Sequence, residues 1–382
     1  MYVRQASGGV LIGGKNHSEI EINRFKFLEQ TEKLGLAPFV EISPAENGQG
    51  TRFWICREIQ EAWAPDRSTL NLCKTLQLDT LAKTDDLEKE ILVAMLLAPV
   101  TFAFPSHDEM LASVRIRQNI VQGARRTALS FHTSKVDRPT EYWRYSEEAG
   151  FILVPGKHLI EALRTATQPD NSEIRYSFSC YRATEYVILL GMALELETSN
   201  PILLQGLQRQ WETRAIMSGR FHDTFLCEYG SVNEPLPMKF YVPGDRLWFR
   251  NPDEASSDVS GYEGSWVFYL GNGLFTNFWE PDKPYTLAEK CVELYHWRHA
   301  IYTDEEGAPR IDETIVDERV CATMKDHAKV QIILGKMMRL RDSKGVYADG
   351  GCIDRTREYP RLVCQGTSDI VLPFDMLMGS PQ

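Results

Sequence analysis

The segment from Tyr176 to Glu197 reads YSFSCYRATEYVILLGMALELE. Its apolar residues Val187, Leu190 and Leu194 recur at helical spacing, so the segment predicts a long helix over 181–197 with one face in a core. Cys180 would then stand at the start of that helix. Free backbone N–H groups and the helix dipole stabilise a thiolate there, and they can stabilise a developing oxyanion. The segment thus fits a nucleophilic cysteine, although a cysteine that is simply packed would fit the same pattern.

Along the rest of the chain, the predicted secondary structure changes from helix to strand at about Gly219. Apolar periodicity before it predicts helices at 18–33, at 70–97 in two pieces, at 108–127 and at 155–164. Apolar runs after it, separated by Pro, Gly, Asp and Asn, predict strands at 224–228, 238–242, 246–250, 266–270 and 274–279. Helical patterns return at 284–303 and 325–341. Helices followed by a sheet and then by helix predict an α+β fold.

The composition is that of a folded globular protein. The chain has 382 residues, with 42 Lys and Arg against 53 Asp and Glu, which gives a formal net charge of −11. Its hydrophobic share of 43% and charged share of 25% exclude a disordered, collagen-like or coiled-coil chain. The acidic balance argues against nucleic acid or an anionic membrane as the main partner. No stretch has the form of a signal peptide or the length of a membrane span, so we expect a cytoplasmic location, with export that needs no cleaved signal left open.

Eight cysteines are scattered along the chain without any CxxC pair. This spacing indicates free thiols in a reducing compartment and not a disulfide framework. Cys291, His296 and His299 could share a helix, but no second cluster supplies the further ligands that a zinc site needs. The loop Gly9-Val-Leu-Ile-Gly-Gly-Lys-Asn16 has Asn where a phosphate-binding loop needs Ser or Thr, so it is interpreted as a glycine turn. We therefore expect neither a metal nor an organic cofactor.

Three segments in the predicted sheet carry a resemblance to a known fold. They are Pro243-Gly-Asp-Arg-Leu-Trp-Phe249, Gly264-Ser-Trp-Val-Phe-Tyr-Leu-Gly-Asn-Gly273 and Leu274-Phe-Thr-Asn277. Together they resemble the NlpC/P60 papain-like pattern of a Pro-Gly-Asp strand, a Leu-Gly-Asn-Gly strand and a strand with a third polar residue. The resemblance implies a papain-like core in which the helix that bears the nucleophile packs on an antiparallel sheet.

Further segments narrow the resemblance to one family. Val114–Arg125, Glu141-Tyr-Trp143-Arg and Gly244–Pro252 resemble the small bacillus-type spore-coat transglutaminases, which are protein-glutamine γ-glutamyltransferases. The similarity is collinear from roughly residue 70 to 300. It implies an N-terminal extension over 1–65, a transglutaminase-like domain over 66–303 and a C-terminal extension over 304–382.

The resemblance assigns roles to residues of this chain. The family's Phe-Glu-Cys matches Phe178, Ser179 and Cys180, so the nucleophile is kept and the neighbouring Glu is replaced by Ser. The family's main carboxylate partner matches Ser265, and its third polar residue, a His, matches Asn277 or its neighbour.

A replacement base is needed, because a serine hydroxyl is not ionised at neutral pH. Glu263 stands two residues before Ser265 and shares its face if the strand has begun by then. Ser265 and Asn277 would then act as hydrogen-bonding supports. His132, His158 and His222 are alternative imidazoles from elsewhere in the chain.

The chemistry implied is acyl transfer through a Cys180 thioester on glutamine side chains of a protein or peptide. A lysine amine would resolve the thioester to an isopeptide bond, and water would give deamidation. Two other classes stay open, namely a papain-like cysteine hydrolase, amidase or other acyltransferase, and an inactive scaffold that binds a protein partner.

Overall fold

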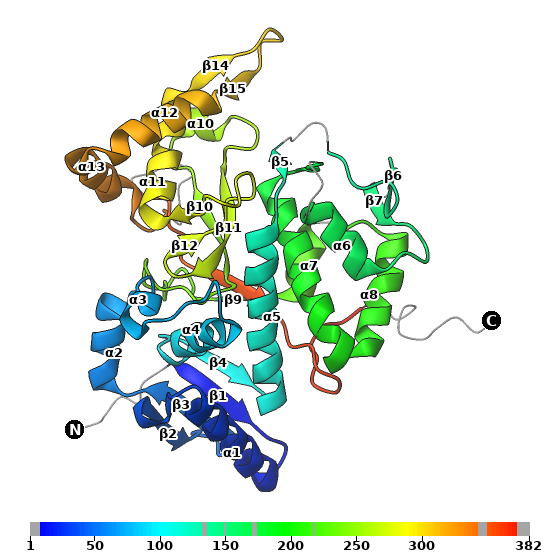
Figure 1. The fold of residues 1–382 in the computed structure, drawn as a ribbon, viewed down its shortest axis with the longest axis vertical. Coiled ribbons are helices and arrows are strands. Elements are labelled where there is room, and N and C mark those ends of the chain that lie inside the picture. The colour runs from blue at the N-terminus through cyan, green and yellow to red at the C-terminus, as the bar shows by residue number, and fades with distance from the viewer. Residues whose placement is uncertain are drawn as a thin grey trace.

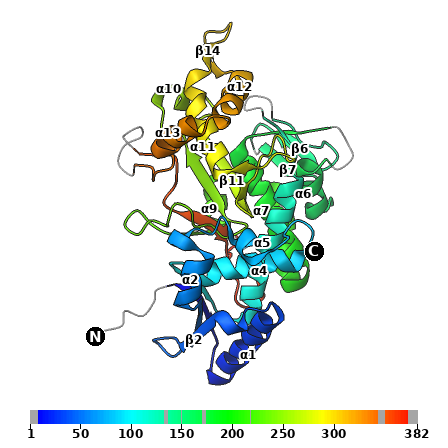
Figure 2. The ribbon, with the colours of Figure 1, turned by 60° about the vertical axis from the view of Figure 1, so that its left-hand side comes forward.

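The structure is a computed structural model, and it describes residues 8–131, 136–148, 150–169, 174–216, 218–342 and 350–372. Two sheets lie on either side of a set of central helices. Figure 1 shows the N-terminal sheet at one end of the molecule and α11, α12 and α13 at the other. The view turned by 60° in Figure 2 keeps this order along the long axis.

Two long helices form the centre of the molecule. They are α5 (His107–Arg126) and α7 (Cys180–Ser199), which run side by side in Figure 1. Gly191 permits their close approach, because a Cβ atom at this position would lie 2.7 Å from the Ile120 side chain. The helices α6 (Leu159–Thr167) and α8 (Pro201–Thr213) pack against α7.

A four-stranded sheet covers one side of these helices. Its strand order is β2 (Val40–Pro44), β3 (Gly50–Ile55), β1 (Gly9–Gly13) and β4 (Thr101–Phe104), with β1 parallel to β4 and antiparallel to β3. One face buries Val10, Phe53 and Phe102 against the core that also contains α1 (His17–Lys33), α4 (Thr84–Leu96) and α5. The opposite face is only partly covered. The short helix η1 (Ala37–Phe39) precedes β2, and α2 (Arg57–Trp63), η2 (Pro65–Arg67) and α3 (Leu72–Leu76) follow β3.

A six-stranded sheet covers the other side, and all of its pairings are antiparallel. Its order is β13 (Tyr285–Thr286), β12 (Leu274–Phe275), β11 (Gly264–Gly271), β10 (Arg246–Arg250), β16 (Arg357–Pro360) and β9 (Leu226–Tyr229). Phe268 and Leu270 of β11 pack into the core formed by α5 and α7. The alternate residues Val267 and Tyr269 join a second core around α11 (Leu287–His296). The sheet therefore has a helix layer on each face.

The C-terminal part of the chain contributes a strand to this sheet and two helices that pack beside it. The helices α12 (Glu313–Met324) and α13 (His327–Met337) pack on α11, and β16 lies between β10 and β9. Cys352 Sγ lies 3.5 Å from Cys291 Sγ of α11, and both thiols are buried. Residues 350–360 of the expected C-terminal extension thus belong spatially to the central sheet.

The remaining elements are short. They are the two-stranded pairs β5 (Ser130–Phe131) with β8 (Ser177–Phe178), β6 (Trp143–Ser146) with β7 (Gly150–Leu153) and β14 (Ile301–Thr303) with β15 (Pro309–Ile311), together with α9 (Ser218–Phe225), α10 (Glu254–Ser257) and η3 (Trp297–His299). No helix among the described residues is long and apolar enough to cross a membrane.

The mixture of helix and sheet and most of the predicted helices are confirmed, whereas several strand predictions are wrong. Residues 238–242 form no strand, because their backbone bonds to Thr69: Thr69 N donates to Lys239 O at 3.1 Å, and Tyr241 N donates to Thr69 Oγ1 at 2.8 Å. The strand expected at 224–228 starts inside α9 and becomes β9, and the one expected at 274–279 is only β12. The helices α8 and α12 were not predicted.

A buried ion pair joins the central helix to the sheet. Arg117 Nη1 of α5 lies 2.8 Å from Asp245 Oδ1, and both side chains are 0% exposed. Asp245 also accepts hydrogen bonds from Val242 N at 2.7 Å and from the Tyr229 hydroxyl. Gly244 has φ of +87°, and a Cβ there would lie 2.9 Å from Arg117 Cα, so only glycine lets the turn before β10 approach α5 this closely.

We expect Arg117→Met to lower the free energy of unfolding by about 3–5 kcal/mol, because it leaves the buried Asp245 carboxylate without its positive partner. Urea unfolding followed by circular dichroism measures the loss. The control is Arg24→Met, which removes an exposed pair with Glu21 and should cost less than about 1 kcal/mol. Equal losses in the two variants would contradict this account of the ion pair.

Candidate active site

The start of α7 is built by a short strand and a serine cap. The strand β8 pairs in parallel with β5, and the chain leaves β8 in extended conformation at Ser179. Ser179 Oγ accepts a hydrogen bond from Arg182 N at 3.3 Å, which is the arrangement of a helix N-cap. The helix therefore begins at Cys180, one residue before the predicted start, and the cysteine stands at the helix N-terminus as expected.

Arg138 holds the strand that leads to Cys180. Its guanidinium carbon lies 3.3 Å from the centroid of the Phe178 ring, and Nη1 donates to Ser177 O at 2.9 Å. Arg138 is only 5% exposed, so this cation–π contact is largely shielded from water. A residue distant in sequence thereby fixes the backbone on which the cysteine stands.

The edge of β11 faces the Cys180 thiol. Phe268 N donates to Thr276 Oγ1 at 2.8 Å at this edge, and alternate backbone N–H groups of a strand point the same way. The N–H of Trp266, two residues earlier, therefore points out of the same edge, and this N–H and that of Tyr181 both act on the Cys180 thiol as backbone donors that lower its pKa. Two backbone donors, one from the helix and one from the sheet, thus favour the thiolate of Cys180.

Burial and charge act in opposite directions on the thiol. Burial raises the pKa of Cys180 above its usual value and is the largest effect. The Trp266 N–H, the Lys290 ammonium and the Tyr181 N–H lower the pKa of Cys180, whereas the Glu263 carboxylate raises it. Burial dominates, so the neutral thiol is favoured at neutral pH, and any change in the neighbouring charges alters the thiolate fraction.

Lys290 of α11 brings a positive charge into a largely buried position near Cys180. Its side chain is 4% exposed, and Nζ lies 2.6 Å from Glu293 Oε2. Nζ also lies 3.8 Å from the centroid of the Tyr285 ring. These contacts hold the ammonium group in place.

Glu263 and Ser265 lie at the beginning of β11. Glu263 is exposed and directly precedes the strand, and its Oε1 accepts from Gly261 N at 3.2 Å. Asn251 N donates to Glu263 O at 3.1 Å, so the ladder continues one residue beyond Gly264. Ser265 is half-buried and pairs with Phe249, which faces the α11 core, so its side chain points toward α11.

Asn277 uses its side chain to organise a loop. Its Nδ2 donates to Lys283 O at 3.2 Å, and its Oδ1 accepts from Trp279 N and Glu280 N at 3.2 and 3.1 Å. Asn277 is 7% exposed. The hydrogen bonds that the structure gives it thus go to the loop 279–283.

Two of the histidines considered as alternative bases are described: His222 lies on α9 and His158 at the start of α6. His222 Nε2 lies 3.0 Å from Glu358 Oε1 of β16, and Nδ1 lies 3.3 Å from Asp223 Oδ1. His158 is exposed at the N-cap position of α6. His132 lies outside the described residues.

The histidines of the rejected zinc pattern contact each other. His296 Nδ1 lies 3.2 Å from His299 Nδ1, and His296 Nε2 lies 2.7 Å from Thr323 Oγ1. Among the residues that the structure describes, no group of three or more His, Cys, Asp or Glu side chains could hold a metal ion.

Sequence reasoning missed Lys290, the Trp266 N–H and a third neighbour, Arg246. Arg246 is 1% exposed, and its guanidinium lies 4.4 Å from the Tyr181 ring and 4.2 Å from the Trp266 ring. It therefore holds together the two residues whose N–H groups lower the pKa of Cys180. The alternation of Arg246, Trp248 and Arg250 in the sequence indicates that these side chains share one face of a strand. It does not indicate which residues of other elements they contact.

Glu185 adds a buried carboxyl to the same helix. Burial raises the pKa of Glu185 to about 7, while Arg182 and Arg246 lower it. Arg182 Nη1 lies 2.5 Å from Glu185 Oε2. The first turns of α7 thus carry a buried carboxyl, Glu185, whose pKa lies near neutral pH.

The chain is similar to bacterial transglutaminases, as the sequence resemblance predicted. A family model described as protein-glutamine gamma-glutamyltransferase matches residues 69–349. The protein-glutamine gamma-glutamyltransferase of Bacillus licheniformis is 29% identical over 192 residues, which cover 49% of this chain and 71% of that protein. The one of Bacillus pumilus is 26% identical over 197 residues, covering 49% of this chain and 72% of that protein.

A solved structure, the transglutaminase from Geobacillus stearothermophilus without its C-terminal extension, is 20% identical and covers 56% of this chain and 98% of that chain, with a TM-score of 0.37. The family model is the broader match, since it extends over well more than half of the chain. On that match, the chain belongs to the protein-glutamine gamma-glutamyltransferase family of acyltransferases.

Proposed function

We propose that Cys180 is the nucleophile of a transglutaminase reaction, in a papain-like core of the NlpC/P60 type. The observation that carries the proposal is the position of Cys180 at the start of α7, which packs on β11, where the Tyr181 and Trp266 N–H groups lower the pKa of the thiol. Donors in this position can stabilise a thiolate before the reaction and a nearby oxyanion during it. The proposed catalytic unit comprises residues 66–303, with β16 completing its sheet.

The proposed reaction runs through a thioester. The Cys180 thiolate attacks the side-chain amide carbon of a glutamine, the carbon–nitrogen bond breaks, and the nitrogen leaves as ammonia after taking up a proton. A lysine amine then displaces the sulfur to form an isopeptide bond, and water in its place gives glutamate. The substrates are therefore a protein or peptide glutamine and an amine donor. The thiol must stay reduced, as it would in the cytoplasm.

Activation of the thiol is assigned to Lys290 and Glu263. Lys290 supplies a fixed positive charge that favours the thiolate. Glu263 is the proposed base: its carboxylate is near enough to act on the pKa of Cys180, and its exposed position at the head of β11 lets it exchange protons with water. Ser265 and Asn277 are proposed as supports, Ser265 beside Glu263 and Asn277 through the loop 279–283.

We expect the wild type to join a glutamine peptide to a small primary amine, and Cys180→Ala to lose the activity at least a thousandfold, because no thioester can form. Mass spectrometry of the peptide measures the product: a gain of amine minus ammonia means transamidation, and a gain of about one mass unit means deamidation. Cys227→Ala is the matched control, since this thiol is also half-buried but lies on β9.

An unmodified peptide under all conditions, with Cys180 inert to iodoacetamide, would contradict the proposal and favour a binding scaffold. Retained activity in Cys180→Ala would place the nucleophile elsewhere.

The pH dependence of Cys180 alkylation tests the assignment of charges. Because burial raises the pKa of Cys180, its rate of reaction with iodoacetamide should climb steadily as the pH rises from 7 to 9. Lys290→Met raises the pKa further and should slow alkylation at pH 8 by roughly two- to tenfold, whereas Glu263→Gln lowers the pKa and should accelerate it by a similar factor. The measurement is mass spectrometry of the peptide that contains Cys180, with Lys283→Met as a control for an exposed lysine.

Glu263→Gln separates the two roles of this residue. If Glu263 is the base, the variant should lose transamidation at least tenfold even though its thiol reacts faster with iodoacetamide. A variant that gained both alkylation rate and turnover would show that Glu263 only opposes the thiolate and is not the base.

A further inference from the structure

A cavity lies on the open face of the N-terminal sheet, in a part of the chain that mostly precedes the family match. The pairings Glu41 with Trp54 and Ser43 with Arg52 place these four side chains on the face turned away from the core. This face, together with α2, η2 and Phe240, encloses about 650 Å³. Ligand pockets in proteins commonly have volumes of about 300–1,000 Å³.

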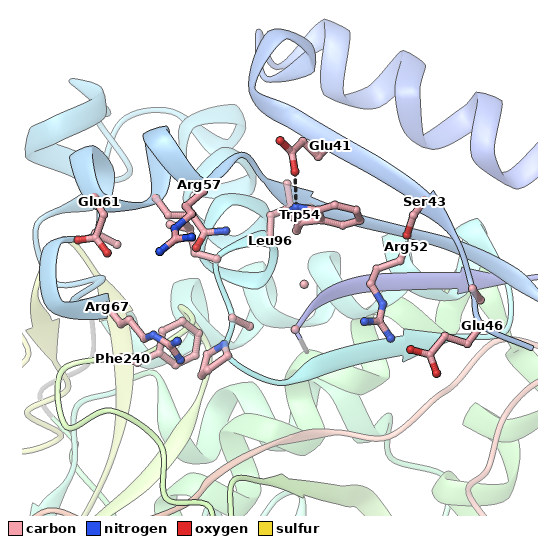
Figure 3. A pocket seen from close by; sticks show the side chains of 18 of the residues that line it. Glu41, Ser43, Glu46, Arg52, Trp54, Arg57, Glu61, Arg67, Leu96 and Phe240 are labelled. Atoms are coloured by element: carbon pink, nitrogen blue, oxygen red, sulfur yellow. Dashed lines mark hydrogen bonds between the residues drawn. The ribbon is translucent and has the colours of Figure 1, made fainter. Parts of the chain in front are cut away.

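Three arginines from three different elements line this cavity. They are Arg52 of β3, Arg57 of α2 and Arg67 of η2. Figure 3 shows Arg57 and Arg67 on one side of the cavity and Arg52 on the other. Within the described residues, neither the Arg57 nor the Arg67 side chain forms an ion pair. Bringing the Arg57 and Arg67 charges to one side of the cavity is unfavourable unless a counter-charge joins them.

The three glutamates of the cavity lie away from its centre. Glu41 Oε2 accepts a hydrogen bond from Trp54 Nε1 at 2.7 Å, which ties this carboxylate to the indole. Figure 3 shows Glu46 beyond Arg52 at one end of the cavity and Glu61 beyond Arg57 at the other. The arginines therefore face the middle of the cavity, although the three glutamates balance their formal charge.

The backbone at Asp66 and Arg67 has an unusual conformation that also indicates a binding site. Asp66 and Arg67 have φ of 53° and 58°, so two successive residues other than glycine adopt the left-handed region. Such residues cost roughly 1 kcal/mol or more each and tend to cluster at binding sites. Here the unusual turn places Arg67 beside Phe240 at the wall of the cavity, as Figure 3 shows.

Trp54 offers a flat apolar surface within the same cavity. Its N–H is occupied by Glu41, which fixes the orientation of the ring, and the ring is half-exposed. A planar group can stack on such a ring, and guanidinium forks bind phosphate oxygens in pairs.

We propose that this cavity is a binding site for a nucleotide. The ring of the ligand would stack on Trp54, and its phosphates would lie between Arg52, Arg57 and Arg67. An amino group of the base could donate to one of the glutamates at the ends of the cavity. The site is separate from Cys180, so its occupancy does not depend on the proposed acyl transfer.

Isothermal titration calorimetry of the full chain in EDTA tests the proposal, with ATP, inorganic triphosphate, adenosine and citrate as the probes. We expect ATP to bind at one site per chain and more tightly than each of the other three. The double variant Arg57→Gln/Arg67→Gln should weaken ATP binding at least tenfold, and Trp54→Leu should reduce the affinity for ATP to that for triphosphate.

The matched control is Arg24→Gln/Arg209→Gln, which removes the same charge from α1 and α8 outside the cavity and should leave ATP binding unchanged. Thermal unfolding of each variant shows that it is folded. Absence of ATP binding would overturn the proposal, as would equal affinities for ATP and citrate or equal losses in the control and the Arg57/Arg67 variant. Triphosphate binding as tight as ATP would refute the stacking on Trp54 and with it the nucleotide.

Discussion

The buried pair of Arg117 and Asp245 is the interaction on which the arrangement of the layers depends. The carboxylate binds the Val242 N–H and the Tyr229 hydroxyl, so it fixes the turn before β10 and the end of β9. The guanidinium lies 5.7 Å from the Phe102 ring of the N-terminal sheet and 5.2 Å from a ring of β16, which brings both sheets and α5 to one point. An isolated charge would be far too costly at this depth, so each element requires the others.

That constraint extends to the proposed nucleophile through the strand ladder. The position of β10 sets β11, since the two strands pair along their full common length. The edge of β11 in turn directs the Trp266 N–H at Cys180. The cysteine and its two donors therefore come from elements that meet only when the core is assembled, and their geometry is a property of the whole fold.

Local patterns in the sequence were enough to predict the helix start at Cys180 and the strands β10 and β11. The apolar spacing in α7 and the apolar runs bounded by Pro, Gly, Asp and Asn are short-range signals. Lys290 could not be predicted as a neighbour of the thiol, nor Arg246 as a neighbour of Tyr181 and Trp266, because their proximity depends on tertiary packing. The same reason explains residues 238–242, where a hydroxyl and the backbone of Thr69 replace the partner strand that the pattern indicated.

The central place of β16 has a consequence for synthesis on the ribosome. The strands β9 and β10 are made early, yet the strand that separates them follows more than a hundred residues after β10. At a translation rate of about 5–20 residues per second, the nascent chain must hold a gap in its sheet for roughly 5–20 seconds. Two strand edges stay unpaired for that time, and such edges invite association with other chains. A chaperone that shields sheet edges during translation would therefore protect this protein when it is most vulnerable.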